Sequence, residues 1–166
     1  KKKFKIINLN ILNKKNIINI LKKFKPKFIF YFAGLSSPKK SFLKPRETYL
    51  SNVKGCSNFL EAILENELSC KFLNASSCEI FAETNKKLNL KSKKKPISPY
   101  GESKLISYAI TKQFREREKI KSYNAIIFNT ESEFRDSHYL IPKICNAAIK
   151  AYKFQTKSAF GNLKIA

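Results

Sequence analysis

The sequence predicts an α/β protein built on a doubly wound parallel sheet. Short apolar runs alternate along the chain with longer segments whose apolar residues recur at helical spacing. The run at residues 28–32 is apolar at every position, which is typical of a strand buried on both faces of a parallel sheet. Ala33 and Gly34 follow it and allow the backbone to turn tightly where this strand ends.

The N-terminal part of the chain contributes the first expected elements. Residues 4–9 are a short apolar run and predict a strand. Residues 14–24 carry apolar side chains at helical spacing, and Pro26 marks the end of the helix that they predict. After the strand at 28–32, the same helical spacing predicts a helix over 47–67.

The second half of the chain begins with a strand predicted over 71–74. Residues 83–97 are polar and rich in lysine, and they predict a surface loop. A long helix is expected next, with Ser98 as its N-cap and Pro99 in its first helical position. A strand and then a helix are predicted over 122–128 and 140–154.

Three of the predicted strands are followed by residues suited to a binding site. These are Gly34, residues 76–79 and residues 129–131. Ligands of doubly wound sheets bind beyond the carboxyl ends of the strands. We therefore expect these three segments to meet at one edge of the sheet.

The chain is strongly basic, with 34 Lys and Arg against 12 Asp and Glu and a net charge of +22. Such an excess suggests a polyanionic partner such as nucleic acid. Only four of the basic residues are arginine, however, and arginine is the side chain preferred for bidentate recognition of bases and phosphates. The lysines are therefore interpreted as general surface charge, and a non-catalytic nucleic-acid-binding protein is kept as the alternative from a different class.

The cysteines give little support to a metal site or a disulfide framework. The four cysteines form no CxxC pair, and His138 is the only histidine. They are interpreted as reduced thiols of a cytoplasmic protein. The longest apolar stretch is far shorter than the roughly 20 residues that a transmembrane helix needs. We expect a soluble protein without a metal.

Residues 100–104, Tyr-Gly-Glu-Ser-Lys, are the first candidate for catalysis. Tyr100 and Lys104 are four residues apart and lie on one face of the expected helix. An ammonium beside a phenol lowers the phenol pKa from its ordinary value of about 10, so that Tyr100 could act as a base near neutrality. Ser77 could share a hydrogen bond with a reacting oxygen, and Glu79 could serve as a second acid or base. Solvent-facing side chains, a capping serine and a solvated glutamate are the non-catalytic alternatives.

Taken together, these residues resemble the extended short-chain dehydrogenase/reductase family, most closely its GDP-mannose 4,6-dehydratase branch. The resemblance covers nearly the whole chain, in family order. It rests on Phe32-Ala33-Gly34, on Ser41-Phe42, Pro45, Thr48, Asn52, Gly55 and Leu60-Glu61-Ala62, on residues 75–81, on Ser98-Pro99-Tyr100 with Lys104, on residues 128–132, and on Arg135, Lys143-Ile144 and Gly161-Asn162-Leu163.

The resemblance implies a Rossmann-like fold and assigns a catalytic role to four residues. Tyr100 would be the base at the sugar 4-hydroxyl, and Lys104 would bind the nicotinamide ribose and depress the Tyr100 pKa. Ser77 would hydrogen-bond the 4-oxygen. Glu79 would remove the C5 proton and protonate the departing 6-hydroxyl, and the hydride would return to C6. The implied reaction is a hydro-lyase step of GDP-fucose biosynthesis that converts GDP-mannose to GDP-4-keto-6-deoxymannose.

The resemblance also implies cofactor and substrate contacts. The cofactor would be NADP, with NAD as the alternative, and the full-length enzyme would be a homo-oligomer. The implied cofactor-binding residues are Asn10, Ala33, Gly34, Tyr100, Lys104 and Asn129. The implied substrate-binding residues are Glu131, Lys143, which would meet the GDP diphosphate, and Asn162.

The sequence departs from the branch at several of these positions. Ser77 replaces the usual Thr and keeps the hydroxyl, Thr130 stands where a His is expected, and Asn10 stands where an Asp normally contacts the adenine. Another extended short-chain enzyme, such as a 4-epimerase or a 4-keto reductase, therefore remains an alternative. Glu79 favours the dehydratase, because a 4-epimerase performs no elimination and carries no carboxylate there.

The four glycines cannot build the Gly-rich turn that a dinucleotide pyrophosphate needs. In the family that turn precedes the segment matching residues 4–9, so the first βαβ portion is expected to be missing. Residues 1–130 are then a partial NAD(P)-binding domain, and residues 131–166 begin a nucleotide-sugar-binding region. The chain is interpreted as an internal fragment that is inactive alone.

Overall fold

A computed structural model describes residues 4–137 and 139–157. The chain divides into two compact units, which are Lys1–Phe128 and Asn129–Ala166. The first unit contains a sheet and most of the helices, and the second contains one long helix, α6 (Leu140–Phe154). No helix among the described residues is long and apolar enough to cross a membrane.

The sheet of the first unit has three parallel strands in the order β1-β2-β3. They are β1 (Phe28–Tyr31), β2 (Lys71–Ser77) and β3 (Lys121–Ile127). The register places Tyr31 opposite Asn74, and Asn74 opposite Asn124. Since consecutive parallel strands need helical crossovers, this arrangement confirms the predicted α/β class.

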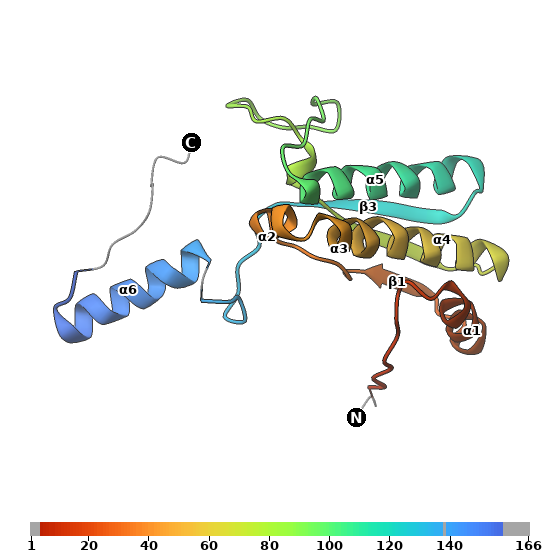
Figure 1. The fold of residues 1–166 in the computed structure, drawn as a ribbon, viewed down its shortest axis with the longest axis horizontal. Helices are drawn as coiled ribbons and strands as arrows, with labels where there is room; N and C mark the ends of the chain where they lie inside the picture. The colour runs from red at the N-terminus through yellow and green to blue at the C-terminus, as the bar shows by residue number, and fades with distance from the viewer. Residues whose placement is uncertain (1–3, 138, 158–166) are drawn as a thin grey trace. The chain divides into compact units, whose positions relative to one another are not determined.

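The helices begin where local capping signals place them. In α1 (Lys14–Phe24) the Asn13 side chain accepts from Asn16 N, and in α5 (Pro99–Arg117) the Ser98 side chain accepts from Gly101 N. The other helical segments of the first unit are α2 (Pro38–Leu43), α3 (Pro45–Tyr49), the π-helix η1 (Leu50–Lys54), α4 (Gly55–Glu65) and the 3₁₀ turn η2 (Cys78–Ile80). Figure 1 shows α4 and α5 lying next to each other along the sheet.

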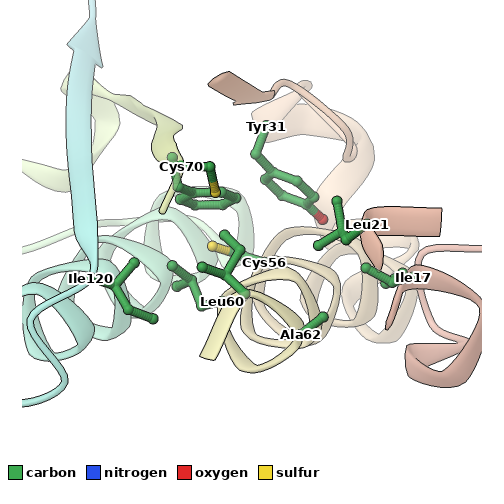
Figure 2. Packing of buried hydrophobic residues seen from close by; sticks show 10 residues of the cluster. Ile17, Leu21, Tyr31, Cys56, Leu60, Ala62, Cys70 and Ile120 are labelled. Atoms are coloured by element: carbon green, nitrogen blue, oxygen red, sulfur yellow. The ribbon is translucent and has the colours of Figure 1, made fainter. Parts of the chain in front are cut away.

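The core lies where α1 and α4 pack against the strands. Ile17 of α1, Leu60 of α4 and Phe72 of β2 are fully buried, and Ile120 joins them just before β3. Figure 2 shows Cys56 and Leu60 between Ile120 on one side and Ile17 and Leu21 on the other. This packing fixes α4, and through α4 it supports α5, which carries the candidate catalytic pair.

The helix predicted over 47–67 is divided into α3, η1 and α4. The Tyr31 hydroxyl donates to Ser51 O at 2.6 Å, which gives one carbonyl of the π-helical turn a partner from the sheet. A Cβ at Gly55 would lie 2.2 Å from the Tyr31 hydroxyl oxygen, so glycine makes room for this phenol. The widened turn brings Ser51 and Asn52 toward the end of β1.

Burial of β1 differs from the prediction. Tyr31 is 3% exposed, but Phe28, Phe30 and Phe32 are 57%, 61% and 64% exposed. Side chains alternate between the two faces of a strand, and the core helices cover the face that carries Tyr31 and Phe72. The expectation that residues 28–32 are buried on both faces is therefore wrong for the described residues.

Other elements also differ from the predictions. Residues 4–9 are not a strand, because no described strand pairs with them. β2 continues past Asn74 to Ser77, since its last residues pair with β3 as far as Ile127. The short helix α2 was not predicted.

Candidate active site at the end of β2

The first turn of α5 places Tyr100 and Lys104 on one buried face. Pro99 occupies the first helical position, and Ser98 Oγ accepts from Gly101 N at 3.0 Å. Tyr100 is 8% exposed and Lys104 is 6% exposed. The Lys104 ammonium nitrogen lies 5.7 Å from the centroid of the Tyr100 ring. The Lys104 ammonium therefore lies over the Tyr100 ring, on the same face of α5.

Lys104 also connects α5 to the end of β2. Its Nζ donates to Ala75 O at 2.8 Å, and this contact is buried. Burial lowers the pKa of Lys104 from its ordinary value, because an ammonium loses hydration in the protein interior. Since an ammonium has three donors, one bond to Ala75 leaves donor capacity for ligand hydroxyls.

The end of β2 presents the two other candidate catalytic residues. Ser77 is 7% exposed, and its hydroxyl accepts from Glu79 N at 3.2 Å, which caps η2. Glu79 is half-buried. A Cβ at Gly101 would lie 2.6 Å from Glu79 O, so glycine lets the first turn of α5 approach the backbone of η2 closely. The segments that carry all four candidate catalytic residues are therefore in contact.

Asn52 joins the turn after β1 to α5. Its Nδ2 donates to Leu35 O at 3.0 Å and to Ser103 Oγ at 2.9 Å, and Ser103 Oγ donates to Tyr100 O at 2.7 Å. Asn52 is 1% exposed. Sequence reasoning did not select it as a site residue, although a polar residue amid the apolar pattern of a predicted helix was the available signal.

The other candidate cofactor residues of the first unit lie in two turns. Ala33 and Gly34 are exposed in the turn after β1, and Gly34 has a φ of 139°. Asn10 is exposed in the turn before α1, where its Oδ1 accepts from Leu12 N at 2.9 Å. The Asn10 side chain therefore supports its own turn in this structure.

The remaining candidates belong to the second unit. Glu131 pairs with Arg135 at 3.3 Å, and the Arg135 guanidinium stacks over the Tyr139 ring. Asn129 and Lys143 are exposed. Asn162, the other candidate for substrate binding, lies outside the described residues.

Burial of Lys104 predicts a pH dependence of stability. Because the folded state lowers its pKa below 10.5, the unfolded chain binds this proton more tightly. The free energy of unfolding should then rise with pH between the lowered pKa and 10.5, by at most about 1.4 kcal/mol per pH unit. Lys104→Met should remove this contribution, which urea unfolding of the full-length gene product at several pH values would measure.

Lys112→Met is the matched control, because Lys112 lies on the exposed side of the same helix in an ion pair with Glu116. We expect this variant to keep the pH slope of the unaltered protein. If the Lys104 variant also kept the pH slope of the unaltered protein, the buried ammonium would make no such contribution to stability.

Comparison with known proteins identifies the family. The family model described as GDP-mannose 4,6 dehydratase matches residues 1–166. The chain belongs to the GDP-mannose 4,6-dehydratase family. It shares 31% identity over 154 residues with the GDP-mannose 4,6 dehydratase of Cricetulus griseus, covering 89% of this chain and 41% of that protein. With the Sinorhizobium fredii enzyme it shares 32% over 136 residues, covering 80% and 39%.

Solved structures show the same fold as this member of the dehydratase family. A Pseudomonas aeruginosa protein, RMD complexed with NADPH, matches with a TM-score of 0.81 and 19% identity over 90% of this chain and 52% of that chain. A dTDP-glucose 4,6-dehydratase from Streptomyces venezuelae with NAD matches with a TM-score of 0.75 and 17% identity over 86% and 44%. The prediction of a partial Rossmann fold is confirmed. The chain spans about 40% of the length of the curated relatives named above.

Proposed function

We propose that this chain carries the catalytic residues of a nucleotide-sugar 4,6-dehydratase that converts GDP-mannose to GDP-4-keto-6-deoxymannose. The observation that carries the proposal is the contact between the end of β2, with Ser77 and Glu79, and the first turn of α5, with Tyr100 and Lys104. This set contains a base, a hydrogen-bond donor and a separate carboxylate. Membership of the dehydratase family supports the same reaction.

The first half of the proposed reaction oxidises C4 of the sugar. The Tyr100 phenolate takes the proton of the 4-hydroxyl as a hydride leaves C4. The Ser77 hydroxyl donates a hydrogen bond to the same oxygen and holds it beside the phenol. The nearby Lys104 ammonium favours the phenolate by electrostatic attraction.

The second half eliminates water across C5 and C6. Once C4 is a ketone, the C5 proton is acidic, and the Glu79 carboxylate removes it. The resulting carboxylic acid protonates the 6-hydroxyl, which leaves as water. A 4-epimerase needs no such group, so Glu79 is the residue that favours the dehydratase over the epimerase alternative.

The donor set fits a nicotinamide dinucleotide. The buried Lys104 ammonium keeps donor capacity that suits ribose hydroxyls. We assign the ribose to Tyr100 and Lys104 and propose further contacts from Asn10, Ala33, Gly34 and Asn129. A bound nicotinamide would supply the hydride acceptor for C4 and the hydride donor for C6. The Tyr100 phenol would return the proton of the 4-hydroxyl to C5 as C6 gains the hydride, which restores the phenolate. NADP is the proposed form, with NAD as the alternative.

The substrate nucleotide is proposed to bind to the C-terminal residues. Glu131 would face the sugar, Lys143 would meet the diphosphate, and Asn162 would contribute a further contact. On this proposal residues 1–130 are part of the dinucleotide-binding domain, and residues 131–166 begin the nucleotide-sugar region.

The proposal is tested by identifying the compound that the full-length protein forms. After incubation with GDP-mannose and NADP, mass spectrometry should find a product lighter by one water. A product of unchanged mass but altered sugar configuration would instead establish an epimerase. No turnover, combined with tight nucleic-acid binding that falls steeply with salt, would favour the nucleic-acid alternative.

A further inference from the structure

The backbone donors at the start of α5 have partners from two different parts of the chain. Gly101 N donates to Ser98 Oγ, the local N-cap, at 3.0 Å. Tyr100 N donates to Ser41 Oγ at 3.1 Å, and Ser41 is 59 positions away in sequence. The first-turn amide of the candidate base is therefore held by a side chain of another helix, α2.

Burial and a second hydrogen bond fix the orientation of the Ser41 hydroxyl. Its side chain is fully buried, at 0% exposure. Its hydroxyl donates to Pro38 O at 2.6 Å, so its proton points into α2. The oxygen lone pairs then remain for Tyr100 N. This geometry gives the hydroxyl one orientation, in which it accepts from α5.

We propose that Ser41 is a positioning residue for Tyr100, an inference that rests on the function proposed above. Ser41 does not touch the reacting atoms on this proposal. It fixes the backbone of Tyr100 against α2, and thereby sets where the phenol lies relative to Ser77 and Lys104. Ser103, which bonds Tyr100 O at 2.7 Å, holds the other side of the same residue.

The position of α2 gives this contact a second consequence. α2 begins four residues after Gly34, and the Gly34 turn is one of the proposed cofactor contacts. The bond from Tyr100 to Ser41 therefore connects the proposed base to the segment that follows the cofactor turn. A shift of about 1 Å in the base can cost about 100-fold in rate. Loss of Ser41 should accordingly reduce kcat more than substrate binding.

The experiment compares Ser41→Ala with Ser37→Ala in the full-length gene product. Ser37 lies at the start of the same helix and accepts from Lys40 N at 3.3 Å, so its loss weakens α2 without removing a contact to Tyr100. Two quantities are measured for each variant. They are amide hydrogen exchange at Tyr100, and kcat and KM for dehydration of GDP-mannose.

We expect exchange at the Tyr100 amide to accelerate about tenfold in Ser41→Ala. In Ser41→Ala we expect kcat to fall about 10-fold to 100-fold with KM unchanged. Ser37→Ala should keep the kcat of the unaltered protein and its exchange rate at the Tyr100 amide. Unchanged exchange at Tyr100, or equal losses in the two variants, would overturn the positioning role. If the alanine variant does not fold, Ser41→Cys keeps the volume with a weaker acceptor and should show smaller changes in the same direction.

The two proposals fail in different ways. Absence of dehydration by the unaltered protein would overturn the proposed function. The comparison of amide exchange between Ser41→Ala and Ser37→Ala would still decide whether Ser41 holds the backbone of Tyr100.

Discussion

The Glu79→Gln variant of the full-length protein is expected to oxidise GDP-mannose at C4, while its rate of water elimination falls by about 10²–10⁴-fold. Glutamine occupies nearly the same volume, but it can neither remove the C5 proton nor protonate the 6-hydroxyl. Tyr100, Ser77 and Lys104 remain, so the first half of the reaction should continue. We expect reduced nicotinamide to accumulate, with a sugar product that still contains the 6-oxygen.

The matched control is Glu83→Gln. Glu83 is exposed in the loop that follows η2, four residues from Glu79, and the same change there removes one carboxylate without altering the end of β2. This variant should dehydrate GDP-mannose at the rate of the unaltered protein. Full dehydration by Glu79→Gln would overturn the proposed role of Glu79 and assign the elimination step to another group.

Local signals predicted much of the fold. Ser98 and Pro99 place the start of α5 because capping depends on residues adjacent in sequence. The helices over 14–24 and 140–154 were predicted with their observed bounds, since each has a strong period of apolar residues between clear ends. The same signals place Tyr100 and Lys104 on one face.

The features that sequence reasoning missed depend on distant partners. The π-helix η1 receives a hydrogen bond from Tyr31, which belongs to another element. The periodicity of residues 47–67 does not predict a π-helix there. Exposure of one face of β1 depends on which faces the helices cover. Asn52 and Ser41 reach α5 across 51 and 59 positions of sequence. Composition and spacing do not identify the distant partner in such a contact.

Replacing Gly34 by alanine is expected to destabilise the protein through two separate costs. At a φ of 139° an L-residue is strained, at a cost of about 1–2 kcal/mol. The added Cβ would lie 1.8 Å from Asn52 Oδ1, so the Asn52 side chain must move. Its part-buried bond to Leu35 O and its buried bond to Ser103 Oγ would then be lost, at about 1–3 kcal/mol for each polar group left without a partner.

A double-mutant cycle separates these costs. Asn52→Ala already removes the bonds and the atom that the new Cβ would meet, so Gly34→Ala should add only the backbone strain in that background. The double variant should therefore be more stable than the sum of the single effects predicts, by about 1–3 kcal/mol in urea unfolding, which is the cost of the lost bonds. Asn58→Ala provides the control background, because Asn58 is an equally buried asparagine whose amide bonds Ile11 O rather than the Gly34 turn.

Additive effects are expected for Gly34→Ala with Asn58→Ala, since these sites share no contact. Additivity of Gly34→Ala with Asn52→Ala would show that steric overlap contributes nothing and that backbone strain explains the whole loss. Coupling confined to the Asn52 background would establish that the turn after β1 and α5 are connected through this one amide. The absence of a side chain at Gly34 would then help to maintain the position of Ser103, and with it the backbone of Tyr100.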